Sequence, residues 1–262
     1  MMRGMYSSAT GMYAQELYID MIANNLANVN TSGFKKSRIE FQDLLYETLR
    51  NAGPPNSQGV VSPIELQIGH GTRPVAVQKL FNQGTLVNTY NPLDLAVKGD
   101  GFFQVTQVDG TMAYTRDGSF KLSAEGKIVT SDGYTLEPEL IIPQDATEVS
   151  ISADGTVSVL MQGENSSEEI GQIELVRFIN PAALTNMGQN VFRANENSGD
   201  PIIGTPGLEG LGTLEQGYVE QSNVEVVEEM VNMIAAQRAY EINSKAIRTA
   251  HDMLSIANNL VR

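Results

Sequence analysis

The sequence predicts a mixed fold: an antiparallel all-β central domain between long N- and C-terminal α-helices that pair as a coiled-coil-like assembly domain. Apolar residues recur at heptad spacing near both ends of the 262-residue chain. Between these ends, Asp-Gly dipeptides separate short strand-like runs, a pattern typical of β-hairpins. Stretches rich in Gly and Pro flank the β-rich region and indicate connections to the helices.

The first expected helix carries an apolar stripe at steps of seven: Met5, Met12, Ile19 and Leu26, with Met2, Ala9 and Ala23 at the partner positions. It is expected to end at NTSG (residues 30–33), where Gly33 can adopt the left-handed conformation that closes a helix. The end of this segment is rich in asparagine, with Asn24, Asn25 and Asn28. Amide side chains both donate and accept hydrogen bonds, which suits a closely packed polar contact between subunits.

The second expected helix begins with a capping box, in which Ser222 and Glu225 satisfy backbone donors. Its stripe advances in steps of three and four: Val224, Val227, Val231, Ala235, Ala239, Ile242, Ala246, Thr249, Met253, Ile256 and Leu260. Five positions of the two stripes are alanine, and each alanine buries little area. Both helices should therefore be marginal alone and need partners.

The middle of the chain has Asp-Gly dipeptides at Asp100, Asp109, Asp117, Asp132 and Asp154. We expect three parts: a helical assembly domain of residues 1–35 plus 221–262, an extended linker region of 36–74 plus 200–220, and a β-rich outer domain of 75–199. Within the linker region, residues 41–50 are helix-like and precede a Pro- and Gly-rich stretch.

Composition excludes several function classes. The net charge of −14 disfavours nucleic-acid binding, and no apolar run is long enough to cross a membrane. There is no cysteine, and two isolated histidines do not make a metal site. Nucleophile-elbow, P-loop and dinucleotide motifs are absent, so we expect no catalytic, cofactor or metal residues. Residues 132–174 contain ten acidic side chains and no Lys or Arg, which predicts a solvated acidic face.

Two long blocks resemble the signatures of the flagellar rod and hook family: ANNLANVNTSGFK (residues 23–35) and VNMIAAQRAYEINSK (231–245). Three interior runs are also similar to that family: LDLAVKGDGFF (93–103), YTRDGSF (114–120) and QGYVEQSNV (216–224). Residues 41–50, the Pro- and Gly-rich stretch after them and LQIG (66–69) resemble the extended insertion of the distal-rod members.

The resemblance implies a structural subunit of the bacterial flagellar basal body, which self-assembles into the tubular distal rod and transmits torque from motor to hook. It implies export through the flagellar type III apparatus to a site outside the cytoplasmic membrane, and the first residues lack the apolar region of a cleaved signal peptide. Expected partners are further copies in a helical tube, proximal-rod proteins, hook protein, and P- and L-ring proteins where an outer membrane is present. Neither nucleic acid nor membrane insertion is expected.

Both helices and the insertion supply candidate site residues. Those expected to act in self-assembly are Met5, Met12, Ile19, Asn24, Asn25, Leu26, Asn28, Gly33, Phe34, Val231, Ala235, Gln237, Arg238, Tyr240, Ile242, Asn243, Met253 and Ile256. Those expected to stiffen the rod are Tyr46, Pro54, Pro55, Pro63 and Gly69.

Two alternatives remain open. The first is a proximal-rod or hook paralogue of the same family, against which the insertion argues. The second is a secreted β-rich hydrolase or sugar-binding module, which would need a cleft with convergent carboxylates and would not need two terminal stripes.

Overall fold

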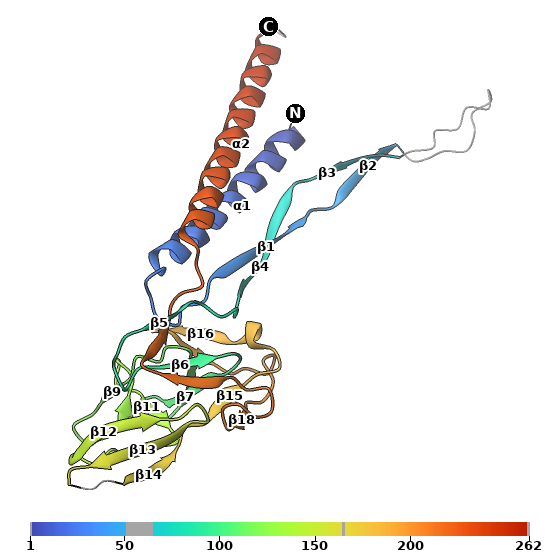
Figure 1. The fold of residues 1–262 in the computed structure, drawn as a ribbon. Helices are drawn as coiled ribbons and strands as arrows, with labels where there is room; N and C mark the ends of the chain where they lie inside the picture. The colour runs from blue at the N-terminus through green and yellow to red at the C-terminus, as the bar shows by residue number, and fades with distance from the viewer. Residues whose placement is uncertain (1, 51–64, 164–165, 261–262) are drawn as a thin grey trace. The chain divides into compact units, whose positions relative to one another are not determined.

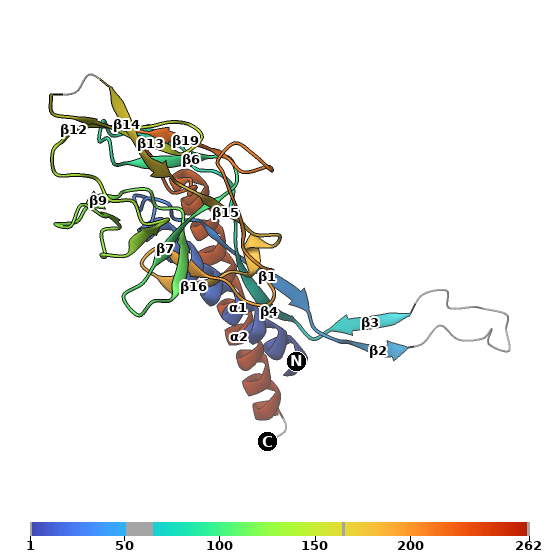
Figure 2. The same ribbon diagram turned by 90° about the horizontal axis from the view of Figure 1, so that it is seen from below.

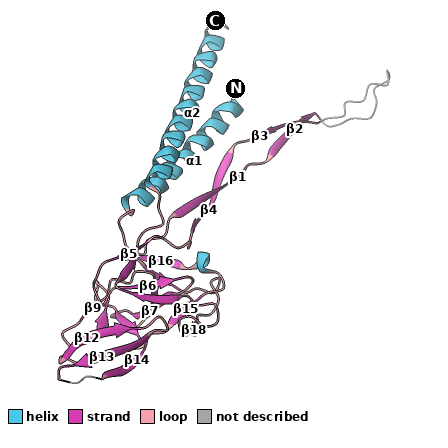
Figure 3. Cartoon of the chain, in the orientation of Figure 1, coloured by secondary structure: helices cyan, strands magenta, loops and turns pink. Residues whose placement is uncertain are grey.

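The computed structural model describes residues 2–50, 65–163 and 166–260 (Figure 1). The chain forms two compact units. The helical unit contains Met1–Leu26, Ser37–Gln78 and Val226–Arg262, and the β unit contains Ala27–Lys36 and Lys79–Glu225. The chain therefore passes between the units at four points. The mixed fold, with helices at both ends and an antiparallel β middle, is confirmed (Figure 3). The three-part division remains a prediction.

Two long helices, α1 (Met2–Ala27) and α2 (Val226–Leu260), lie side by side in the helical unit (Figures 1 and 2). The first ends at Ala27, before the expected stop, and Gly33 has its left-handed φ of 68° in a later turn. The expected capping box is wrong. Ser222 lies four positions before the first helical residue, and its buried hydroxyl has no hydrogen-bond partner among the described residues.

The helical unit also contains a ribbon of paired strands. Strand β1 (Ser37–Asp43) pairs with β4 (Thr72–Lys79), and β2 (Tyr46–Arg50) pairs antiparallel with β3 (Leu66–Gly69). The helix-like interpretation of residues 41–50 is therefore wrong. Downstream strands provide pairing partners, and this tertiary contact outweighs local helix propensity. Pro54, Pro55 and Pro63 lie outside the described residues.

The β unit is built around an antiparallel sheet with the order β16-β17-β8-β7-β11-β10-β9, in which β15 pairs with β7 and β18. Smaller sheets pair β12 with β13 and β14, β19 with β6, and β20 with β5. Its strands are β5 (Leu86–Asn88), β6 (Leu95–Lys98), β7 (Phe102–Thr106), β8 (Met112–Thr115), β9 (Lys121–Leu122), β10 (Ile128–Val129), β11 (Thr135–Glu137), β12 (Ala146–Ile151), β13 (Thr156–Met161), β14 (Ser167–Gln172), β15 (Leu175–Arg177), β16 (Thr185–Gly188), β17 (Val191–Arg193), β18 (Ile202–Gly204), β19 (Thr213–Gln216) and β20 (Tyr218–Glu220).

Three of the expected Asp-Gly turns join consecutive paired strands. They connect β7 to β8 at Gly110, β10 to β11 at Gly133, and β12 to β13 at Gly155. Each of these glycines has φ between 80° and 87°, which glycine adopts without steric cost. The other two dipeptides lie beside strands: Gly101 precedes β7, and Gly118 follows β8.

The core of the β unit is apolar and consists of two clusters of buried side chains. Phe103 and Phe120 pack edge to face with ring centroids 5.1 Å apart, among buried side chains such as Leu136, Val157 and Leu175. A second cluster gathers Phe102, Tyr114, Val176, Phe178, Leu184 and Phe192. Such a core holds the strand ends firmly, including the end of β20 at Glu220 and the residue that follows β8, Arg116.

Candidate assembly surface and buried polar joint

Helix α2 has two faces of different chemistry. Toward the rest of the helical unit it buries Glu229, Ala236 and Ala250. The apolar stripe expected from the sequence lies on the exposed side: Val227 is 75% exposed, Val231 60%, Ile242 68% and Ile256 57%. We define the outer stripe as Val227, Val231, Ala235, Ile242, Met253 and Ile256. Soluble proteins rarely leave a contiguous apolar stripe uncovered unless it meets a partner.

The contact between α1 and α2 uses mostly small and polar residues instead. Ala14, Ile22 and Asn25 are the buried residues of α1. The side chain of Asn243 on α2 packs against Gly11 on α1, where an added Cβ would lie 3.0 Å from Asn243 Nδ2. Small side chains at such points allow close helix packing but bury little area.

Asn25 joins the end of α1 to the start of β1 through hydrogen bonds. Its Oδ1 accepts from the Ser37 backbone N–H at 2.9 Å, and its Nδ2 donates to the Ser37 carbonyl at 3.0 Å. The same Nδ2 lies 3.4 Å from Glu229 Oε2 on α2. Because Asn25 is fully buried, losing these bonds would leave an unsatisfied amide.

The structure divides the candidate self-assembly residues between these environments. Buried or half-buried positions are Met5, Met12, Ile19, Asn25, Leu26, Asn28, Gly33, Phe34 and Asn243. Exposed positions are Asn24, Val231, Ala235, Gln237, Arg238, Tyr240, Ile242, Met253 and Ile256. The candidates on α2 are thus mostly available to another molecule, and their role in assembly remains a prediction.

Two candidate stiffening residues meet in the ribbon. Tyr46 pairs with Gly69 across β2 and β3, and a Cβ on Gly69 would lie 3.2 Å from the Tyr46 ring. The tyrosine ring therefore covers the glycine. The ribbon also exposes large apolar side chains, including Leu45 at 87% and Val77 at 62%. This surface is a second candidate for contact with another copy.

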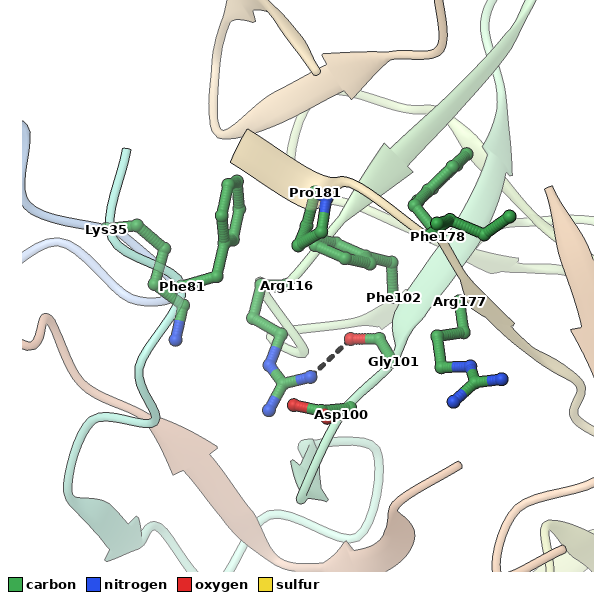
Figure 4. Close-up of a pocket in the computed structure, with 10 residues that line it drawn as sticks. Lys35, Phe81, Asp100, Gly101, Phe102, Arg116, Arg177, Phe178 and Pro181 are labelled. Atoms are coloured by element: carbon green, nitrogen blue, oxygen red, sulfur yellow. Dashed lines mark hydrogen bonds between the residues drawn. The ribbon is translucent and has the colours of Figure 1, made fainter. Parts of the chain in front are cut away.

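A buried ionic cluster lies inside the β unit. Glu220, at the end of β20, accepts from Lys35 Nζ at 2.7 Å and from Arg116 Nε at 2.6 Å. All three residues are at most 5% exposed. Arg116 also donates to the carbonyls of Gly101, Gly99 and, at 3.1 Å, Val97. Figure 4 shows the bond from its guanidinium to Gly101.

The electrostatics of this cluster are set by burial and pairing together. Burial lowers the pKa of Lys35, although Glu220 opposes that shift. Burial alone would raise the pKa of Glu220, but the charges and hydrogen bonds of Arg116 and Lys35 outweigh it, so the pKa falls. Glu220 therefore remains ionised as the counter-charge of two cations.

Asn223 extends the cluster into a larger network. Its Oδ1 accepts from the Lys36 backbone N–H at 2.7 Å, and its Nδ2 donates to the carbonyls of Leu80 at 2.9 Å and Asn82 at 3.1 Å. We call Lys35, Arg116, Glu220 and Asn223 the polar joint. Sequence reasoning missed it, although all four residues lie in the family-like runs, because nothing in a linear sequence shows that they meet. These runs are themselves mostly polar, so no local pattern marks the four residues as buried.

A pocket of about 390 Å³ adjoins the polar joint. Lys35 and Arg116 line it together with Arg177, Asp100 and a wall of Phe81, Phe102 and Phe178 (Figure 4). The described part of the chain holds no group of three or more His, Asp or Glu side chains suited to a metal ion. No described helix combines the length and apolar character needed to cross a bilayer.

Comparison with known proteins places these features in one family. Residues 5–35 match the family described as flagella basal body rod protein, residues 96–159 match the flagellar hook protein FlgE/F/G D1 domain, and residues 215–260 match the flagellar basal body rod FlgEFG protein C-terminal region.

Two FlgG relatives match over all or nearly all of the chain. The chain is 51% identical to the flagellar basal-body rod protein FlgG of Borreliella burgdorferi, with 100% of both chains covered. It is 48% identical to FlgG of Buchnera aphidicola from Schizaphis graminum, over 99% of this chain and 100% of the relative. The flagellar hook protein FlgE of Helicobacter mustelae is 33% identical, over 85% of this chain and 48% of the hook protein. The chain therefore belongs to the FlgG family of flagellar basal-body rod proteins, whose members are structural proteins and not enzymes.

Proposed function

We propose that this chain is the subunit of the flagellar distal rod and polymerises into a tubular drive shaft through its terminal helices. The observation that carries the proposal is the outer stripe of α2, which is exposed along the helix from Val227 to Ile256. A stripe on one copy that contacts a different surface on the next copy makes a head-to-tail contact, and such contacts generate open helical polymers.

The rod assignment within the family rests on length as well as identity. Two FlgG relatives are covered completely by this chain, whereas the FlgE hook protein extends to about twice the matched length, since only 48% of it is covered. This favours a rod subunit over a hook paralogue. A β-rich hydrolase or sugar-binding module is excluded by family membership.

Electron microscopy tests the proposal directly. Concentrated full-length protein is compared with a chain that ends after residue 225, which lacks α2 but keeps the polar joint. The full chain should form straight tubular filaments, and the shortened chain should stay monomeric while its β unit retains its thermal transition. Filaments of equal length from both proteins would show that α2 is not the polymerisation device.

We further propose that the ribbon braces neighbouring subunits and keeps the rod straight. Support comes from the Tyr46–Gly69 pair and from the apolar residues that the ribbon exposes. Deleting residues 46–69 should give curved or flexible filaments, which electron microscopy measures as a shorter persistence length. Straight filaments of unchanged stiffness would assign the segment another role.

The acidic stretch gives a third element of the proposal. Exposed carboxylates between residues 132 and 174 include Asp132, Asp145, Glu148, Asp154 and Glu168. We propose that their like-charge repulsion keeps the shaft from adhering to the ring proteins around it. Replacing them by Asn or Gln should slow rotation of tethered cells, and unchanged rotation would remove the idea.

Family membership also supports a set of partners. We propose that the subunit contacts proximal-rod proteins at one end of the rod and hook protein at the other, with P- and L-ring proteins around it where an outer membrane is present. We also propose that the flagellar type III apparatus exports it without a cleaved signal peptide. Mass spectrometry of the N-terminus from isolated basal bodies tests the last point, since a processed terminus would contradict it.

A further inference from the structure

Three chain segments that lead into or out of the β unit meet at the polar joint. These are residues 27–36, 79–84 and 220–225, at the boundaries of the unit. Gly33 donates to the Glu220 carbonyl at 2.8 Å, Leu80 donates to the Lys36 carbonyl at 2.9 Å, and Gly84 donates to Glu220 Oε1 at 2.7 Å. These three bonds join each segment to both of the others. Asn223 adds a further connection, because its side chain is hydrogen-bonded to Lys36 and to Leu80.

The polar joint contains two cations and one carboxylate, so its stability depends most strongly on the carboxylate of Glu220. Lys35 and Arg116 are two buried cations, and Glu220 is the carboxylate that hydrogen-bonds to both. Removing either cation leaves the other paired with Glu220. Removing Glu220 leaves two cations in the protein interior, with backbone carbonyls such as those of Asn82 and Gly101 and the charge of Asp100 near Lys35 as the remaining compensation. Breaking a buried pair by deleting its partner is among the most destabilising changes known.

Sequence separation adds a constraint on timing. Lys35 and Glu220 are 185 residues apart, and Arg116 lies 104 residues before Glu220. The N-terminal segment around Lys35 can be buried only when the C-terminal segment supplies the carboxylate. Until then, the lysine ammonium remains in water, since an unpaired charge is costly to bury.

We propose that Glu220 is a closing residue, which allows residues 33–36 to become ordered only when residues 220–223 dock beside them. This inference rests on the proposed function. In a distal-rod subunit, residues 33–36 would become ordered only after residues 220–223 have docked against the β unit. The joint also holds all three segments together at the boundary of the β unit, so we expect them to unfold cooperatively.

The test measures hydrogen exchange in the full-length monomer, at the backbone amides of Gly33 and Lys36. Glu220→Gln should lower the protection factors of both amides by about 100-fold. Leaving a buried charge unpaired changes the equilibrium between the closed and open states by at least about two factors of ten. The matched control is Glu215→Gln, on the neighbouring strand β19, since Glu215 pairs with the exposed Lys98 at 2.8 Å. This control should change protection by less than about fivefold, as expected for a surface pair.

Combined substitutions separate the charge argument from a simple packing defect. Lys35→Met alone should be milder than Glu220→Gln, because the Arg116–Glu220 pair survives. Adding Lys35→Met to Glu220→Gln should restore at least about tenfold of the lost protection, since one uncompensated cation is removed. If the double variant is worse than Glu220→Gln, or if Glu220→Gln leaves both amides protected, the proposal is wrong.

These measurements are independent of polymerisation. If the unsubstituted chain forms no filaments while the exchange pattern follows expectation, the rod proposal is wrong and the proposed role of Glu220 is supported. If filaments form from a Glu220→Gln chain with unchanged protection, the joint fails and the rod proposal stands. Should Glu220→Gln prevent folding altogether, the double variant still decides, because recovery of a folded chain on adding Lys35→Met supports the charge argument and continued failure to fold contradicts it.

Discussion

Replacing Ile242 by aspartate should block polymerisation while leaving the monomer folded. Ile242 is 68% exposed and lies in the middle of the outer stripe. Complete burial of an isoleucine is worth about 1.5–3 kcal/mol, so covering the exposed two thirds contributes roughly 1–2 kcal/mol to each subunit contact. Aspartate forfeits this and adds the cost of desolvating a charge, so the contact weakens by at least about 3 kcal/mol. The critical concentration for filaments should rise by about 100-fold.

Sedimentation of filaments over a concentration series measures the critical concentration, and a thermal melt of the monomer measures folding. Val108→Asp is the matched control, because Val108 is 90% exposed in the turn between β7 and β8 of the other unit. Ala236→Asp is the opposite control, since Ala236 is buried against the rest of the helical unit and its replacement should unfold that unit. A critical concentration for Ile242→Asp equal to that of Val108→Asp would refute the reasoning.

Three further results follow from the described contacts. The pKa of Glu220 is lowered because its two cations outweigh its burial, so its stabilisation is present above the ordinary value of 4.5 and is lost as the pH falls through the folded-state pKa. Urea unfolding from about pH 6 to about pH 3 should show this loss, and a Glu220→Gln chain should lack that part of it. Gly33→Ala should lower the free energy of unfolding by about 1–3 kcal/mol, because φ is 68° and the new Cβ would lie 2.5 Å from the backbone nitrogen of Asp117; Gly4→Ala, with open space around it, is the control for a denaturant titration. Amides of α1 and α2 should exchange quickly in dilute monomer and slowly in filaments, and uniform protection in the monomer would contradict the role of partners.

Local signals in the sequence were sufficient where the structure is local. Heptad spacing predicts both helices because each apolar stripe is a property of one segment, and Asp-Gly predicts the turns at Gly110, Gly133 and Gly155 because glycine tolerates their backbone conformation. Residues 41–50 were misjudged because their conformation depends on strands from residues 66–79. The capping box failed because Ser222 is buried upstream of the helix that it was expected to cap.

The polar joint could not be predicted for a related reason. Lys35, Arg116 and Glu220 are ordinary charged residues in sequence, and each would be expected at the surface. Their burial follows from the path of the chain, which returns residues 220–223 beside residues 33–36. An ionic cluster of this kind becomes visible only when the fold brings together segments that are far apart in the sequence.

The distribution of residues over α2 separates two contacts by their chemistry. An isolated helical pair would ordinarily bury its most apolar faces against each other, yet here α1 buries Ala14, Ile22 and Asn25, and α2 buries Glu229, Ala236 and Ala250. Apart from Ile22, these side chains are small or polar, so the inner contact buries little apolar area. The outer stripe is apolar, and hydrophobic contacts do not require a particular orientation. It stabilises the protein only when another surface removes it from water. A subunit arranged in this way keeps only a weak contact between its helices and reserves the burial of the outer stripe for the polymer, which agrees with the fast exchange expected of both helices in the monomer.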